Sequence, residues 1–101
     1  MWVKLLDSDA LAEGQMMPVQ VDDLAIALYR IDGVVYATSN ICTHQYALMT
    51  DGYFDGRLIE CSLHQGLFDV KTGAALEGPI TEGLKCFPVE EREGSIFLRT
   101  V

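Results

Sequence analysis

Two short pairs of residues in the middle of the chain carry side chains that bind metal ions. Cys42 is paired with His44, Cys61 is paired with His64, and sixteen residues separate His44 from Cys61. Both histidines of the chain and two of its three cysteines lie in these pairs. Side chains only one or two residues apart can face one point only from a tight loop. The pattern therefore predicts two loop tips, brought face to face by a hairpin over residues 51–60, whose four side chains converge.

Three interpretations of these pairs compete. The cysteines could be ordinary core residues beside incidental histidines, although two mixed pairs argue against coincidence. The four residues could also form a structural Cys₂His₂ zinc site with tetrahedral geometry. Zinc sites usually take ligands of one kind from each loop, as in CxxC and HxxxH spacings, so a Cys and a His from each loop is unusual for zinc.

A [2Fe–2S] cluster with two cysteines on one iron and two histidines on the other explains the mixed pairs. Each loop would send its cysteine to an inner iron and its histidine to an outer one. Two ferric ions, two sulfides and two thiolates are neutral together, whereas four thiolates would leave a negative charge. Neutral imidazoles therefore make reduction easier and raise the potential. We favour one such cluster per chain, held by Cys42, His44, Cys61 and His64.

Short apolar runs separated by glycine turns must position these loops. Asp32-Gly33 separates residues 28–31 from 34–36, and Glu93-Gly94 separates residues 87–89 from 96–98. Such spacing is typical of hairpins, and strands at these intervals predict an all-β sandwich or barrel. We expect a β-framework built from both ends of the chain, with a loop-rich cluster-binding subdomain inserted at about residues 39–83.

Length and charge restrict the class of protein further. The 101 residues are enough for one domain, residues 1–101, and the net charge of −8 repels nucleic acid and anionic lipid. No apolar run approaches the roughly 18 residues of a membrane span, and no signal-type apolar core follows the N-terminus. We expect a cytoplasmic protein that binds neither nucleic acid nor membrane.

The sequence around the two pairs resembles a known motif. Residues 42–44, 51–53 and 56–73, with the C-T-H and C-x-x-H-x-G spacings, are similar to the Rieske motif. The similarity spans essentially the whole chain and is closest to ferredoxin components of bacterial aromatic-ring-hydroxylating dioxygenases, of the naphthalene and biphenyl dioxygenase type. Gln45 and Ser62 stand where glycine and proline are common in that family, and neither departure removes a ligand.

The resemblance implies a Rieske fold and a role for each candidate ligand. Cys42 and Cys61 would bind the buried iron, His44 and His64 the exposed iron, and Gly78-Pro79 would form a third loop that covers the cluster. High-potential Rieske proteins carry Ser and Tyr where this chain has Gly66 and Phe68. Because hydrogen-bond donors near the cluster raise its potential, we expect a potential near the lower end of the Rieske range.

The resemblance also implies partners and a function. The chain would be a one-electron carrier without catalytic residues of its own, reduced by a flavin-dependent ferredoxin reductase that uses NAD(P)H. It would pass the electron to a terminal oxygenase that has its own Rieske centre. Two alternatives stay open: a small Rieske-type subunit of another reductase, such as an assimilatory nitrite reductase, and a structural zinc module. We expect Cys86, outside the motif in the strand-like segment 84–89, to be a buried thiol.

Overall fold

The regular secondary structure in the computed structural model of the chain consists almost entirely of short β-strands. It describes residues 2–42, 47–62, 66–77 and 82–99. Within these ranges no α-helix occurs, and two single-turn 3-10 helices accompany the strands, so the all-β prediction is confirmed. The elements are β1 (Trp2–Asp7), η1 (Ser8–Ala10), β2 (Met16–Val21), β3 (Leu24–Ile31), β4 (Val34–Ser39), η2 (Met49–Asp51), β5 (Tyr53–Phe54), β6 (Leu58–Glu60), β7 (Leu67–Asp69), β8 (Ala75–Glu77), β9 (Val89–Arg92) and β10 (Ser95–Arg99).

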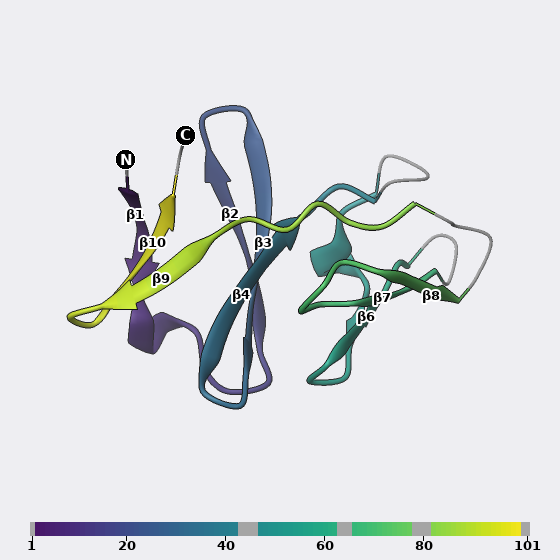
Figure 1. Cartoon of the computed structure of the whole chain (residues 1–101), viewed down its shortest axis with the longest axis horizontal. Helices are drawn as coiled ribbons and strands as arrows, with labels where there is room; N and C mark the ends of the chain where they lie inside the picture. The colour runs from purple at the N-terminus through teal and green to yellow at the C-terminus, as the bar shows by residue number, and fades with distance from the viewer. Residues whose placement is uncertain (1, 43–46, 63–65, 78–81, 100–101) are drawn as a thin grey trace.

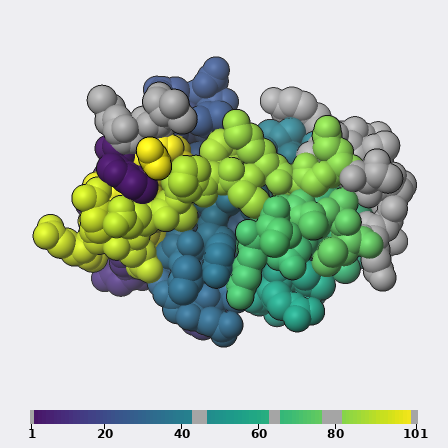
Figure 2. Space-filling model, viewed as in Figure 1, coloured from purple at the N-terminus to yellow at the C-terminus, as the bar shows by residue number. Residues whose placement is uncertain are grey.

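The strands form three antiparallel sheets. The first has the order β1-β10-β9, the second β2-β3-β4 and the third β5-β6-β7-β8. The sheets follow one another along the 40 Å long axis of the molecule, with β2-β3-β4 in the middle (Figure 1). Residues 82–88 run across the face seen in Figures 1 and 2 and join the third sheet back to β9. The two ends of the chain thus build one framework sheet, while a contiguous central segment builds the third.

The middle sheet is apolar on both faces, because alternate residues of β3 enter two different cores. Ile26 and Leu28 pack with Ile96 and Leu98 against the first sheet. Ala27 and Tyr29 belong to the other core, on the side of the third sheet, whose further buried members are Ile31, Cys42, Ala47, Met49, Ile59, Cys61, Phe68, Val70 and Leu84. Since neighbouring side chains of a strand point to opposite faces, β3 supports the framework and the metal-binding loops at once.

The hairpin turn between β3 and β4 forms where the sequence predicts it. Asp32 and Gly33 have φ angles of 52° and 80°, which is the type I′ geometry that matches the twist of the flanking strands. The backbone N–H groups of both residues donate hydrogen bonds of 2.7 Å to the carboxylate of Glu13. Glu93-Gly94 makes the same kind of turn between β9 and β10, with φ angles of 51° and 79°. Local turn chemistry therefore specifies both hairpins.

The prediction that Cys86 is buried is wrong. Its side chain is exposed, and it lies in an extended segment that is joined to β4 by a single bridge, Thr38 to Cys86. Strand β9 begins only at Val89, so this segment is not the sheet strand that its apolar pattern indicated. Within the described ranges no helix is long and apolar enough to cross a membrane.

Candidate metal centre

The first cysteine lies at the end of a short two-stranded stem. The backbone N–H of Cys42 donates to the carbonyl of Ala47 at 2.8 Å, and Ile41 and Leu48 form an isolated bridge below this hydrogen bond. The side chain of Cys42 is 3% exposed. Residues 41–42 and 47–48 therefore form the stem of a loop, and this stem keeps Cys42 in the core.

The second cysteine has a matching environment. Cys61 directly follows β6, its side chain is 0% exposed, and its N–H donates to the carbonyl of Gly66 at 2.9 Å. The pair Glu60 and Leu67 of the β6–β7 ladder lies immediately below. In both loops the cysteine N–H therefore bonds to the carbonyl five residues further along the chain.

The two stems are in backbone contact at Gly52. A Cβ atom at this position would overlap the carbonyl oxygen of Glu60, the residue before Cys61. The N–H of Gly52 donates to the carbonyl of Met49, in the 3-10 helix that follows the first loop. The predicted hairpin that joins the loops is present as β5 and β6, with Tyr53 opposite Glu60. A residue without a side chain thus allows the two cysteine-bearing loops to lie side by side.

Cys42 and Cys61 share one apolar core with Met49, Ile59 and Phe68. His44, His64 and the Gly78-Pro79 turn lie outside the described residues, so the complete ligand set stays a prediction. In the part of the chain that is described, no group of three or more His, Cys, Asp or Glu side chains is arranged to hold a metal ion. The structure brings the two predicted cysteines into one core and leaves the two histidines untested.

A buried polar pair lies in the same core. The hydroxyl groups of Tyr29 and Thr38 form a hydrogen bond of 2.9 Å, and the hydroxyl oxygen of Thr38 also lies 3.0 Å from the carbonyl oxygen of Ser39. Burial raises the pKa of Tyr29 to about 12. The ring of Tyr29 also packs edge-on against Phe54, with 5.2 Å between centroids. Tyr29 therefore stays neutral and links β3 to the hairpin of the third sheet.

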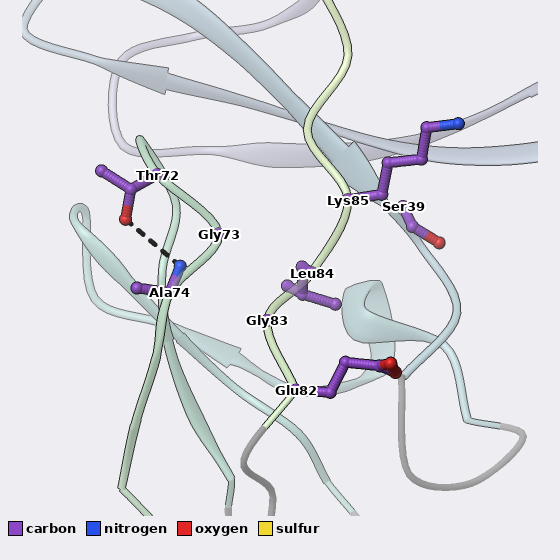
Figure 3. A pocket seen from close by; sticks show the side chains of 8 residues that line it. All are labelled: Ser39, Thr72, Gly73, Ala74, Glu82, Gly83, Leu84 and Lys85. Atoms are coloured by element: carbon purple, nitrogen blue, oxygen red, sulfur yellow. Dashed lines mark hydrogen bonds between the residues drawn. The ribbon is translucent and has the colours of Figure 1, made fainter.

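The segment that returns from the third sheet to the framework is held from both sides. The N–H of Leu84 donates to the carbonyl of Gly73 at 2.7 Å, and the carbonyl of Lys85 accepts the N–H of Ser39 at the same distance. Figure 3 shows this segment between the turn at residues 72–74 and the end of β4, beside a hollow of about 460 Å³. Among the described residues that line this hollow there is no cysteine. Nearby Cys86 has a raised pKa because of partial burial and the charge of Asp69, so its thiol is not activated.

Comparison with known proteins defines the class. The Rieske [2Fe-2S] domain family matches residues 1–88. The ferredoxin component of the naphthalene 1,2-dioxygenase system of Pseudomonas putida is 47% identical over 89 residues, which cover 88% of this chain and 86% of that protein. The Sphingomonas yanoikuyae B1 ferredoxin has a TM-score of 0.93 and 36% identity, with both chains covered completely. A chain in the complex of reduced oxygenase and oxidized ferredoxin in carbazole 1,9a-dioxygenase has a TM-score of 0.89 and 36% identity over 96% of this chain and 91% of that chain.

The chain belongs to the Rieske [2Fe-2S] family, among the ferredoxin components of aromatic-ring dioxygenase systems. It is an electron-transfer component and not a catalytic subunit, and its family implies one [2Fe–2S] cluster. The described residues fit that group, because two buried cysteines on adjacent loops would supply the two thiolates of one iron. The resemblance included Gly52 without giving it a role, and neither the resemblance nor the spacing had indicated the buried Tyr29–Thr38 pair.

Proposed function

We propose that this chain carries one electron at a time on a [2Fe–2S] cluster whose ligands are Cys42, Cys61, His44 and His64. The observation that carries the proposal is the equivalent placement of the two cysteines, each buried and each followed by a loop closed by its own N–H. The cysteines would bind the inner iron and the histidines the outer iron. Residues 39–83 would then be the cluster-binding part of a single domain, residues 1–101.

The described residues shape the electrostatics around the proposed ligands. Ile59, Met49 and Phe68 surround the two cysteines and exclude water from the sulfur atoms. When bound, the cluster stores one electron at a potential set by its ligands, its hydrogen bonds and its exposure. In an apolar environment of this kind, backbone N–H groups have a large effect on that potential, because their dipoles are weakly screened.

The partners follow from the family. A flavin-dependent reductase that oxidises NAD(P)H would reduce this chain, and a terminal oxygenase with its own Rieske centre would accept the electron. The solved complex of an oxygenase and a ferredoxin in carbazole 1,9a-dioxygenase supports the second partner. We place the protein in the cytoplasm, where such a reductase has access to NAD(P)H.

Metal analysis with cysteine variants tests the ligand set. Purified protein should contain about two irons and two acid-labile sulfides per chain and should give a Rieske-type EPR spectrum after reduction. Cys42→Ser and Cys61→Ser should lose the cluster, while Cys86→Ser, a matched cysteine variant outside the motif, should keep it. His44→Cys or His64→Cys should lower the potential of any cluster that survives, because a thiolate replaces a neutral ligand. Stoichiometric zinc in a colourless protein, prepared anaerobically with ample iron, would contradict the proposal.

Reconstituted turnover tests the direction of electron flow. With a ferredoxin reductase and a terminal oxygenase of a naphthalene-type system, oxidation of the aromatic substrate should depend on this chain and should stop when Cys61→Ser replaces it. Stable copurification with a large reductase subunit, together with no support of oxygenase turnover, would instead assign the chain to another reductase.

A further inference from the structure

The two cysteine-bearing loops are supported very differently. The stem of the second loop is the β6–β7 pair, which lies inside a four-stranded sheet. The stem of the first loop has one isolated bridge, Ile41 to Leu48, and belongs to no sheet. Because a single bridge cannot fix a stem by itself, another interaction must hold the first loop closed.

Asn40, at the base of this first stem, supplies that interaction. Its side chain is buried, with 2% of the residue exposed. The side-chain oxygen accepts the backbone N–H of Thr50 at 2.9 Å, and the side-chain nitrogen donates to the hydroxyl oxygen of Thr50 at 3.1 Å. One amide therefore binds the backbone N–H and the hydroxyl group of the same residue across the stem, as acceptor and as donor.

The backbone of Asn40 connects this pair to the framework. Its N–H donates to the carbonyl of Ala25 in β3 at 2.9 Å, and its carbonyl accepts the N–H of Met49 at 2.7 Å. Asn40 thus bonds to the framework on one side and to both residues at the far end of the loop on the other. Cys42 is two residues away, within the part of the stem that these bonds enclose.

We propose that Asn40 is a positioning residue for Cys42, and that its bonds to Thr50 replace the sheet that the first loop lacks. The proposal rests on the proposed function, in which Cys42 binds iron. The amide satisfies the two groups at once, because its oxygen accepts the N–H of Thr50 and its nitrogen donates to the hydroxyl oxygen. Loss of the amide leaves partly buried polar groups of Thr50 without these partners, which favours an open loop.

Iron release and EPR together test this role. Reduced holoprotein would be mixed with a ferrous chelator, and the loss of the cluster followed by its visible absorption. Asn40→Ala should release iron about tenfold faster than wild type and shift the EPR g values, since loss of about 1.4 kcal/mol from a barrier is a tenfold change in rate. Thr50→Val should change both measurements in the same direction, and Thr50→Ser, which keeps the hydroxyl and the N–H, should restore wild-type behaviour.

Glu13→Ala is the matched control for a purely structural effect. Like Asn40, Glu13 is not a proposed metal ligand, and its side chain accepts hydrogen bonds from the backbone. Its two bonds lie at the β3–β4 turn, at the opposite end of β4 from Asn40. This variant should lower the thermal midpoint while the g values and the iron release rate stay as in wild type. If Asn40→Ala and Thr50→Val behave like Glu13→Ala, the positioning role is refuted and Asn40 merely stabilises the fold.

Each remaining outcome also decides the matter. If Asn40→Ala does not fold, Thr50→Val compared with Thr50→Ser gives the same answer, because these two differ in the hydroxyl group that Asn40 binds. A wild-type protein without a [2Fe–2S] cluster would refute the proposed function. If the wild-type protein has a normal cluster, and Thr50→Val and Thr50→Ser release iron at the same rate, only the role of Asn40 is refuted.

Discussion

Gly66 and Phe68 occupy buried positions next to the second cysteine. The carbonyl of Gly66 accepts the N–H of Cys61, and Phe68 is fully buried in the core that contains both cysteines. Neither side chain has a hydrogen-bond donor. A donor near the cluster would stabilise the extra electron of the reduced form, so the two residues favour a low potential at this position.

Introducing donors at these two positions should raise the potential. We expect the wild-type protein near −150 mV, the lower end of the Rieske range of roughly −150 to +300 mV. Gly66→Ser and Phe68→Tyr should each shift it upward by tens of millivolts, because 59 mV for one electron corresponds to about 1.4 kcal/mol, the strength of an ordinary hydrogen bond. Protein-film voltammetry measures the shift. A wild-type value above about +100 mV would be incompatible with a carrier that reduces a dioxygenase.

The contact between the two loop stems depends on one residue without a side chain. Gly52 has a φ of −90°, so its backbone conformation is open to any residue, and only the missing Cβ explains glycine there. The Cβ of an alanine would meet the backbone carbonyl of Glu60, which cannot move aside by rotation of a side chain. Glu60 and Cys61 would have to shift together.

Gly52→Ala should therefore change the metal centre as well as the fold. We expect a loss of about 3 kcal/mol in unfolding free energy, typical of overpacking against rigid atoms, and a lower iron content or shifted EPR g values. Gly94→Ala is the control, because its Cβ has open space and its cost is limited to the positive φ of 79°. Chemical unfolding and iron analysis of both variants would separate the two effects. A Gly52→Ala protein with wild-type iron content and spectrum would show that the stems can separate without consequence.

An ion pair between Arg30 and Glu91 connects the middle sheet to the first sheet. Arg30 in β3 donates two hydrogen bonds to the carboxylate of Glu91 in β9, at 3.0 Å and 2.9 Å. Its guanidinium also donates to the carbonyls of Leu11, Ser8 and Gly33. The arginine side chain is 13% exposed and that of the glutamate 31%, so water screens this pair less than a fully exposed one.

This ion pair should make stability depend on pH in the acid range. The hydrogen bonds from Arg30 lower the pKa of Glu91 below its ordinary value of 4.5. A carboxyl group whose pKa is lower in the folded state stabilises the fold above the unfolded pKa, and this contribution is lost as the pH falls through the folded pKa. Glu91→Gln should cost about 1 kcal/mol at pH 7 and should flatten the decline below pH 4.5, measured by urea unfolding. An identical decline in wild type and variant would assign the acid sensitivity to other groups, such as Asp55, whose pKa is also lowered.

The net charge of the whole molecule should affect its encounters. Fifteen acidic residues against seven Lys and Arg give −8, which attracts a partner with a basic docking surface. Electron transfer from the reductase should slow as ionic strength rises from about 10 mM to about 1 M, over which the Debye length falls from about 30 Å to about 3 Å. Stopped-flow reduction measures this dependence, and reduction by a small uncharged reagent is the control. A rate independent of salt would exclude electrostatic steering.

The sequence alone determined the features that depend on neighbouring residues. Asp32-Gly33 and Glu93-Gly94 predicted their hairpins because residues at positive φ specify a two-residue turn wherever the strands go. The short apolar runs predicted an all-β protein, and the two Cys/His pairs predicted an iron–sulfur cluster, which the family assignment supports. These signals are local, so they needed no knowledge of which strands pair.

Only the tertiary structure decided the contacts between distant residues. Cys86 was predicted to be buried because its neighbours are apolar, yet its segment pairs with β4 at a single bridge and leaves the side chain exposed. Packing between segments also decided three other features. These are the contribution of β3 to two cores, the close contact of Gly52 with Glu60, and the hydrogen bonds between Asn40 and Thr50. A pattern of residue types records which side chains are apolar or polar, but it does not record which backbone atoms they will face. That information arises only when the loops and sheets come together.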